Sequence, residues 1–298
     1  MEFNQISIPC KRQVDEWFSL FGIGDIHEGS AGSDTEAVKK VINEVLNDDN
    51  AYWIGMGDYG EFINFSDPRF DIRSLAKKYR NGSIDNICQE QIDSVCELLF
   101  PIRHKCLGLL RGNHEETIKR RYHHDVLYDM WKCLNEIKTP IRQADNVVVS
   151  PDNYKKAKIR LLYDMAVVRL SFTHGEGKKY NKGCRSFDVL VTHGNTSGRT
   201  DGAKVNRIQN LLREWNTVDV VMVAHGHSMP VTSFTTQSFN RAHTLETRKR
   251  RGFMTGSFLK TYTVGSPCYG EKAGYAGAEI GTPRLQFNPK TLDMRVIV

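Results

Sequence analysis

The sequence predicts an α/β protein, and three observations lead to this fold class. Short apolar runs that suit buried strands alternate with segments whose apolar residues recur at helical spacing. Polar residues and glycines follow directly after the apolar runs, where open α/β sheets bind their ligands. The 298 residues contain no internal repeat, low-complexity tract or long linker, so we expect a single domain over residues 1–298.

These patterns place the individual strands and helices. The first helix is expected to begin near Ser33, because Ser33 and Glu36 have the spacing of a capping box and apolar residues then recur every three or four positions. Beyond residue 253 the chain becomes strand-like and then rich in glycine. In chain order, the expected strands are residues 17–23, 51–56, 106–110, 166–172, 188–192 and 218–223, and the later helices are residues 84–99, 122–134 and 203–215.

Composition bounds the class of protein and its surroundings. Hydrophobic residues make up 40% of the chain and charged residues 26%, as in ordinary soluble domains. No segment is long and apolar enough to cross a bilayer, and the N-terminus lacks the pattern of a secretory signal. The seven cysteines are scattered and form no C-x-x-C pair, which indicates reduced thiols. We therefore expect a cytoplasmic protein without a membrane partner.

The charge balance of the chain is mildly basic. The formal net charge is +6 at pH 7, which favours anionic partners such as phosphate esters, nucleotides or nucleic acid. A solvated surface with a slight excess of lysine explains the same balance equally well. Charge alone therefore suggests a class of partner without identifying one.

Polar residues gather where five of the expected strands end. They offer carboxylate and amide oxygens and neutral imidazoles, a ligand set that suits Mn²⁺, Fe or Zn²⁺. Asp25 and His27 are two positions apart, as are His225 and His227, so each pair points to one side of an extended segment. Such a set is too large for one tetrahedral ion but suits two ions that share a carboxylate. The candidates are Asp25, His27, Asp58, Asn113, His114, His193, His225 and His227.

Five ordered motifs carry a family resemblance. They are GDIH at 24–27, GD at 57–58, GNHE at 112–115, THG at 192–194 and HGH at 225–227. Together they resemble the calcineurin-like metallophosphoesterases, and they span most of the chain. The resemblance implies a four-layer α-β-β-α sandwich of two mixed sheets, with two divalent metal ions in the active site. Manganese is favoured, with iron, zinc or magnesium as alternatives.

The resemblance also implies a role for each candidate residue. A metal-activated hydroxide would attack phosphorus, and His114 would bind the phosphate and assist the leaving group. Arg111, next to the third motif, is a candidate contact for the substrate phosphate, although it can equally pair with a neighbouring acid. The implied ligands are Asp25, His27, Asp58 and His227 for one ion, and Asp58, Asn113, His193 and His225 for the other.

Departures from the family pattern narrow the expected substrate. Glu28 precedes Gly29 where GDxHG is usual, and Ala224 replaces the first glycine of GHxH. The segment LLRGNHE is very like the Ser/Thr protein phosphatases, but GDYGEF stands where they have GDxVDRG with its phosphate-binding arginine. We therefore expect hydrolysis of phosphodiesters in nucleotides or nucleic acid. The alternatives are a phosphomonoesterase or phosphoprotein phosphatase and, outside enzymes, a nucleic-acid-binding module that retains the fold.

Three further features remain open at this level. His174 also lies in a THG sequence and competes with His193 for the fourth motif. The basic run RKRR at 248–251 can follow a nucleic-acid backbone, although a solvated loop is the favoured interpretation. The glycine-rich C-terminal segment, residues 265–298, can cover the active site.

Overall fold

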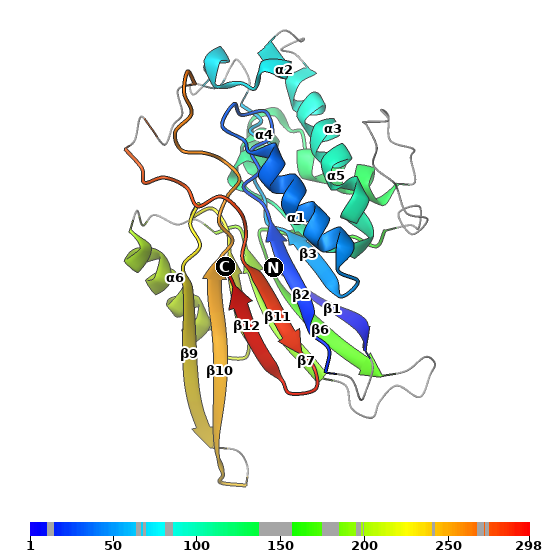
Figure 1. Ribbon diagram of the computed structural model, residues 1–298, viewed down its shortest axis with the longest axis vertical. Coiled ribbons are helices and arrows are strands. Elements are labelled where there is room, and N and C mark those ends of the chain that lie inside the picture. The colour runs from blue at the N-terminus through cyan, green and yellow to red at the C-terminus, as the bar shows by residue number, and fades with distance from the viewer. Residues whose placement is uncertain are drawn as a thin grey trace.

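Two mixed sheets lie face to face in this protein, with helices on their outer sides (Figure 1). The structure is a computed structural model. It describes residues 1–10, 15–63, 67, 70–80, 86–136, 157–174, 185–194, 198, 200–239, 242–266, 271 and 274–298.

The first sheet, called sheet 1, has the strand order β12-β11-β2-β3-β4-β5. Its strands β2 to β5 are parallel, whereas β11 and β12 are antiparallel to their neighbours. The strands are β2 (Phe18–Ile23), β3 (Ala51–Gly55), β4 (Cys106–Leu110), β5 (Leu161–Tyr163), β11 (Arg284–Asn288) and β12 (Asp293–Ile297).

The second sheet, called sheet 2, has the order β1-β6-β7-β8-β10-β9. Strands β7, β8 and β10 are parallel, and β9 returns antiparallel to β10 as a hairpin. The strands are β1 (Glu2–Cys10), β6 (Met165–His174), β7 (Arg185–Thr192), β8 (Val220–Val223), β9 (Val231–Phe239) and β10 (Leu245–Met254).

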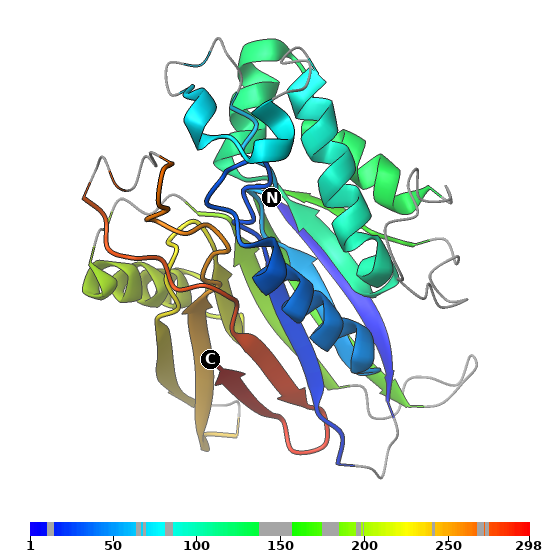
Figure 2. The ribbon, with the colours of Figure 1, turned by 45° about the horizontal axis from the view of Figure 1, so that its top comes forward.

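The helices complete a four-layer α-β-β-α sandwich, as the motifs implied. Helices α1, α3 and α5 bury their apolar faces against sheet 1, and α6 buries its face against sheet 2 (Figures 1 and 2). Apolar side chains of both sheets fill the space between them, among them Leu20, Ile54, Val168 and Met222. The helices are α1 (Thr35–Asn47), α2 (Lys77–Arg80), α3 (Ile87–Leu99), α4 (Asn113–Tyr122), α5 (Val126–Asn135) and α6 (Asp201–Glu214), with 3-10 turns at Ile72–Ser74 and Phe100–Lys105.

The central strands explain why their sequences are continuously apolar. All residues of β2 and of β4 are buried, because one face packs on the helices and the other on the opposite sheet. Polar residues are therefore excluded until the strand ends. No helix among the described residues combines the length and the hydropathy needed to cross a membrane.

Two of the differences from the predicted helix boundaries have a clear local cause. The N-cap of α1 is Asp34 rather than Ser33: the Asp34 carboxylate accepts from the Ala37 N–H at 3.1 Å, while the Ser33 hydroxyl donates to the Ile26 carbonyl. The helix expected at 122–134 is α5 and begins later, at Val126, because Tyr122 ends the separate helix α4. His123 adopts a left-handed conformation with φ of 55°, which ends α4, and α5 then begins.

The basic run at 248–251 lies on strand β10 and not in a solvated loop. Alternate residues of the run bind the end of α6 and the segment that follows it. Arg250 is buried and donates to the carbonyls of Leu212 and Trp215, at the C-terminal end of α6. Arg248 donates to the Thr217 carbonyl and pairs with Asp219. The hairpin of β9 and β10 extends beyond the other strands (Figure 1).

Candidate metal centre

The candidate residues follow the carboxyl ends of five strands from both sheets. Strands β2, β3 and β4 of sheet 1 and β7 and β8 of sheet 2 end next to one another, which brings distant parts of the chain together. Three sets of side chains each place their possible ligand atoms within 4.8 Å of one another. The sets are Asp25, His27 and His227; His27, Asp58 and His114; and Asp58, His193 and His225.

The backbone at this edge is strained in a consistent way. Five of the candidate residues have positive φ angles of 48° to 67°, a backbone conformation that residues other than glycine rarely adopt. A further constraint is close packing at Gly112, where a Cβ atom would lie 2.1 Å from Asp58 Oδ1. Such strain persists where the surrounding structure over-determines the geometry, as in functional sites. The five residues are Asp25, His27, Asp58, His225 and His227.

Asp25 is fully buried and binds both histidines of the last motif. Its Oδ1 lies 3.1 Å from His227 Nε2, and its Oδ2 accepts from the His225 N–H at 3.0 Å. Burial alone raises the pKa of this carboxyl, but the hydrogen bond and charge of His227 outweigh burial and hold the pKa below its usual value. Asp25 is therefore a buried carboxylate that needs cationic neighbours.

His27 presents one ring nitrogen to a carboxylate, and the other has no hydrogen-bond partner within the described part of the chain. Its Nδ1 lies 2.9 Å from Glu61 Oε2. Its Nε2 is buried, has no hydrogen-bond partner among the described residues, and lies 3.9 Å from both Asp25 Oδ1 and Asp58 Oδ2. A carboxylate behind one nitrogen and a lone pair on the other is the usual arrangement of a metal-binding histidine.

Asp58 stands between the two sides of the centre. Its Oδ1 accepts from the His114 N–H at 2.9 Å, which leaves Oδ2 facing His27 Nε2 at 3.9 Å and His193 Nε2 at 3.3 Å. Burial raises the pKa of the Asp58 carboxyl, but the charges of His193 and His114 lower it well below the usual range. Asp58 Oδ2 thus faces both His27 and His193.

His193 is held in one tautomer by the backbone. Its Nδ1 lies 2.8 Å from the Met56 carbonyl, which can only accept, so Nδ1 carries hydrogen. Its Nε2 faces Asn113 Oδ1 at 3.1 Å as well as Asp58 Oδ2. Burial lowers the pKa of His193, but the Asp58 carboxylate outweighs burial and raises the pKa to about 10. The site therefore attracts a cation to the Nε2 position.

His114 lies beside His27 at the start of α4. The two ring centroids are 4.8 Å apart and the rings are nearly perpendicular. His114 Nδ1 lies 2.5 Å from the Glu61 carbonyl and therefore carries hydrogen. Glu61 thus orients both histidines, one through its carboxylate and the other through its backbone.

Glu115 fixes the loop that carries Asp58. Its buried carboxylate accepts from the backbone N–H groups of Asp58, Tyr59 and Gly112 at 2.7 to 2.9 Å. Burial and the Asp58 charge raise the pKa of Glu115 to about 7. Three donors from two loops converge on this side chain, which joins the ends of β3 and β4.

Comparison with known proteins gives these observations a family. A family profile described as calcineurin-like phosphoesterase matches residues 18–229, which include all five motifs. The chain belongs to the calcineurin-like phosphoesterase family. A search of curated proteins found no match. A solved structure that is similar comes from Streptococcus pneumoniae TIGR4 and is described as a conserved uncharacterized protein and predicted phosphoesterase; it is 9% identical with a TM-score of 0.31, over 92% of this chain and 86% of that chain, which is too weak to carry an argument.

The side chains of this phosphoesterase fit divalent cations. His27 Nε2 and His225 Nδ1 are buried without hydrogen-bond partners among the described residues. Burial and the charge of His193 lower the pKa of His225, which keeps that imidazole neutral and its lone pair available. Oxygen and imidazole donors together suit first-row divalent metals. Family and geometry therefore support a metal-dependent phosphoesterase.

The alternative histidine of the fourth motif lies elsewhere. Strand β6 runs antiparallel to β7, with Met165 opposite Thr192 and Phe172 opposite Arg185. His174 therefore ends β6 beside the start of β7, whereas His193 follows the end of β7. The pairing of these strands favours His193 over His174.

Arg111 is occupied by acids in this phosphoesterase. The buried guanidinium lies 3.2 Å from Glu116 and 3.3 Å from Asp125. This is the pairing with neighbouring acids that the sequence left open. Contact of Arg111 with a substrate phosphate stays a prediction.

Glu61 is a residue of the candidate site that sequence reasoning missed. Its signal was a carboxylate three residues after Asp58, in the segment GDYGEF. On a loop that spacing has no fixed geometry, so the side chain's direction toward His27 was not readable from it. Burial raises the pKa of Glu61, but the charges of His114 and His27 and the hydrogen bond to His27 lower it below the usual value.

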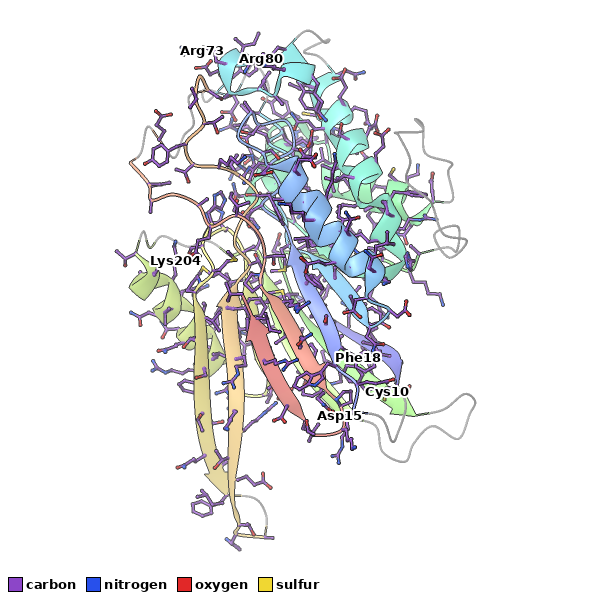
Figure 3. The ribbon with its side chains drawn as sticks, in the orientation of Figure 1. Cys10, Asp15, Phe18, Arg73, Arg80 and Lys204 are labelled. Atoms are coloured by element: carbon purple, nitrogen blue, oxygen red, sulfur yellow. The ribbon has the colours of Figure 1, made fainter. Side chains whose placement is uncertain are left out.

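Other segments brace the loop of the HGH motif. Lys204, which is labelled in Figure 3, lies in the first turn of α6. Its Nζ donates to Ser228 Oγ at 2.7 Å. From the glycine-rich segment, the Glu279 N–H donates to the His227 carbonyl, and the Glu279 carboxylate accepts from the Met229 N–H. Residues 284–297 of that segment form β11 and β12 instead. That the remainder covers the active site stays a prediction.

Proposed function

We propose that this phosphoesterase hydrolyses phosphodiesters of nucleotides or nucleic acid in the cytoplasm, using two divalent ions of which manganese is favoured. The observation that carries the proposal is the meeting of carboxylate, amide and imidazole groups from both sheets, with two imidazole nitrogens buried and unpartnered among the described residues. A site built only for structure would pair these nitrogens internally.

The ligand assignment follows the two sides of Asp58. Because Asp58 Oδ2 faces both His27 and His193, it is the oxygen proposed to be shared. The proposed ligands are Asp25, His27, Asp58 and His227 for one ion, and Asp58, Asn113, His193 and His225 for the other.

The chemistry divides between the ions and the chain. Two divalent ions supply Lewis acidity, which lowers the pKa of water and offsets charge on phosphoryl oxygens. His114 is proposed as the general acid. Since its Nδ1 hydrogen is held by the Glu61 carbonyl, the protonated ring carries its second hydrogen on Nε2, from which a proton can pass to the leaving oxygen. Glu61 orients His27 and His114 through its carboxylate and its backbone carbonyl.

Two observations favour a diester substrate. The chain carries a net charge of +6, which suits polyanions such as nucleic acid. Aligning GDYGEF with GDxVDRG puts Phe62 where the protein phosphatases have their phosphate-binding arginine. Phe62 is 2% exposed and packs in the core beneath α3, so this loop offers no cation to a phosphomonoester at that position.

A metal analysis paired with a substrate panel tests the proposal. We expect about two ions per chain, and faster hydrolysis of bis-p-nitrophenyl phosphate than of p-nitrophenyl phosphate with Mn²⁺, with loss of both activities under a chelator. Activity that survives complete metal removal would rule out the mechanism. Preference for the monoester would keep the metal chemistry and replace the diester by the phosphomonoesterase alternative.

Nucleic acid as the natural substrate has its own test. Binding of an oligonucleotide should weaken steeply with salt, because neutralised phosphates release counterions. An affinity that does not change between low and moderate salt would exclude a nucleic-acid backbone and leave nucleotides as the proposed substrate.

A further inference from the structure

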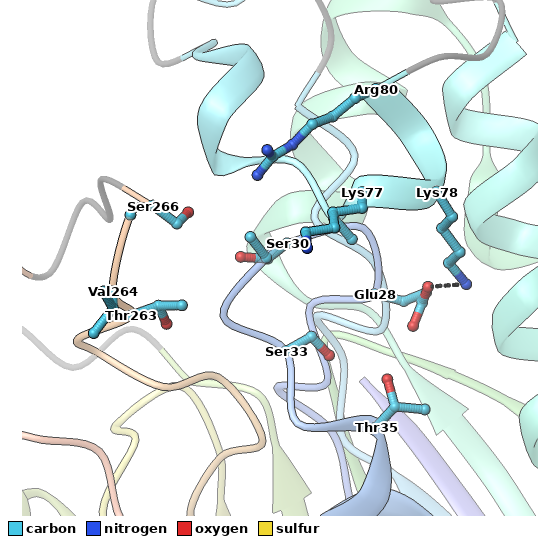
Figure 4. A pocket seen from close by; sticks show the side chains of 13 residues that line it. Glu28, Ser30, Ser33, Thr35, Lys77, Lys78, Arg80, Thr263, Val264 and Ser266 are labelled. Carbon is cyan, nitrogen blue, oxygen red and sulfur yellow. Dashed lines mark ion pairs between the residues drawn. The ribbon is translucent and has the colours of Figure 1, made fainter.

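A pocket of about 430 Å³ lies behind the loop that follows His27, and no candidate metal ligand lines it. Figure 4 shows it between α2, which carries Lys77 and Arg80, and the turn that carries Thr263 and Ser266. The loop that follows His27 forms the wall between these two segments. The complete lining is Glu28, Ser30, Ala31, Ser33, Thr35, Ala76, Lys77, Lys78, Arg80, Thr263, Val264, Gly265 and Ser266.

The lining has an excess of positive charge. Its three cations all come from α2, and its one acid, Glu28, is already neutralised: Glu28 lies 2.7 Å from Lys78 Nζ and accepts from the Tyr79 hydroxyl at 2.8 Å. Arg80 donates through Nε and Nη2 to backbone carbonyls, which fixes its guanidinium. Lys77 is exposed and has no ion pair among the described residues. A cation that no described residue pairs with therefore faces the pocket.

Hydroxyl groups supply the remaining polar surface. Two of them are engaged, because Ser33 donates to Ile26 and Ser266 donates to Arg73. Ser30 Oγ accepts from the Gly32 N–H, so its own hydrogen is available to a ligand. Thr263 Oγ1 is buried and has no hydrogen-bond partner among the described residues. Because that atom has almost no exposed surface, Ser30 is the one of these four residues whose hydroxyl can donate to a ligand.

We propose that this pocket binds the phosphate group of a small organic phosphate, at a site separate from the metal centre. Lys77 and the fixed Arg80 provide the charge, and the Ser30 hydroxyl donates to a phosphate oxygen. The volume lies within the range of pockets for small molecules, which leaves space for an organic part beside the phosphate.

Binding is measured by isothermal calorimetry on the full chain stripped of metal with a chelator, so that the metal centre does not compete. The probes are AMP, adenosine and inorganic phosphate. We expect AMP to bind at one site, more tightly than inorganic phosphate, and adenosine not to bind. Because this arm needs neither metal nor turnover, its failure would leave the proposed function untouched.

Two variants locate the site. Lys77→Glu should weaken AMP binding by about tenfold or more, since it replaces the unpaired cation with an anion. The matched control Lys290→Glu makes the same charge change at an exposed lysine in the turn between β11 and β12, and should leave the affinity unchanged. Ser30→Ala should weaken AMP binding about threefold to tenfold, because it removes the hydroxyl whose hydrogen is available to the ligand.

The proposal is overturned if the wild-type chain does not bind AMP at millimolar concentration, or if Lys77→Glu and Lys290→Glu behave alike. AMP affinity equal to that of inorganic phosphate would overturn the organic part of the ligand. Kinetics of the metal-loaded chain in the presence of AMP show whether the bound phosphate belongs to the substrate or to a separate effector. If AMP inhibits competitively and Lys77→Glu abolishes the inhibition, the pocket binds a remote part of the substrate. If AMP changes turnover without competing and Lys77→Glu abolishes the change, the pocket binds a separate effector.

Discussion

The candidate metal centre and the β9–β10 hairpin both concentrate charged residues, but the charges serve different purposes in the two places. In the hairpin the charges belong to one strand, and alternate residues such as Arg248 and Arg250 bind the carbonyls that end α6 and its following loop. In the metal centre the charged groups come from five strand ends, and nitrogens of His27 and His225 remain unpaired among the described residues. A run of charge along one strand can thus serve the fold, whereas charge gathered from separate strands is left for a ligand.

The largest effect that would test this contrast is at Asp58. Asp58→Asn removes the negative charge that His27 and His193 face. We therefore expect metal content to fall and the rate of diester hydrolysis to drop about a thousandfold or more. Asp293→Asn, at an exposed position in β12, is the control and should keep both. Metal analysis and steady-state kinetics measure the outcome. An Asp58→Asn protein with full metal and activity would show that these charges do not act together.

His114→Ala separates catalysis from metal binding. Loss of the proposed proton donor should lower turnover about a hundredfold to a thousandfold, while metal stoichiometry stays that of the wild type. The measurement is kcat alongside metal content. Because His114 also groups with His27 and Asp58, loss of metal in this variant would instead make it a ligand.

Glu61→Gln tests whether the second carboxylate matters through His27. The amide keeps the size of the side chain but is a weaker acceptor for the His27 Nδ1 hydrogen, so metal affinity should fall about tenfold to a hundredfold. Glu36→Gln, at an exposed site on α1, is the matched control. Titration of the metal-free proteins with Mn²⁺ gives the affinities. Equal affinities in the two variants would remove Glu61 from the metal centre.

The hairpin supplies the smallest expected effects. Arg250→Met leaves the α6 carbonyls without their donor and should lower the free energy of unfolding by about 1–3 kcal/mol. Lys249→Met, at the exposed neighbouring position, should change it by less than about 0.5 kcal/mol. Urea denaturation measures both. If Lys249→Met lowers the salt slope of oligonucleotide binding by about one, the exposed side of this run also contacts nucleic acid.

Much of the central fold was predictable because its strands are buried on both faces. β3 and β4 are short apolar runs with polar residues only at their ends, and the family profile confirms the resemblance that those ends suggested. The positions of the candidate ligands followed from the same rule, because polar residues are excluded from the strands themselves. Their tautomers, distances and left-handed backbone depend on contacts between distant segments, which a linear sequence does not display.

The edges of the fold were less predictable for a physical reason. β1 and β9 pair on one side only and carry many polar residues, such as the VTSFTTQSF of β9, so their periodicity is weak. Helix α4 begins at Asn113 with the residues NHEE, whose polar side chains serve the site and hide the helical pattern. At both places tertiary pairing, and not local propensity, decides the structure.

The proposed ligands come from both sheets, and this division has a mechanical consequence. An ion held by Asp25 and His227 would rivet sheet 1 to sheet 2 across the apolar layer that separates them. By reciprocity, whatever loosens that layer would weaken the grip on the ion, and saturation with metal would stiffen the sandwich. At low metal concentration the protein would then be less rigid as well as inactive.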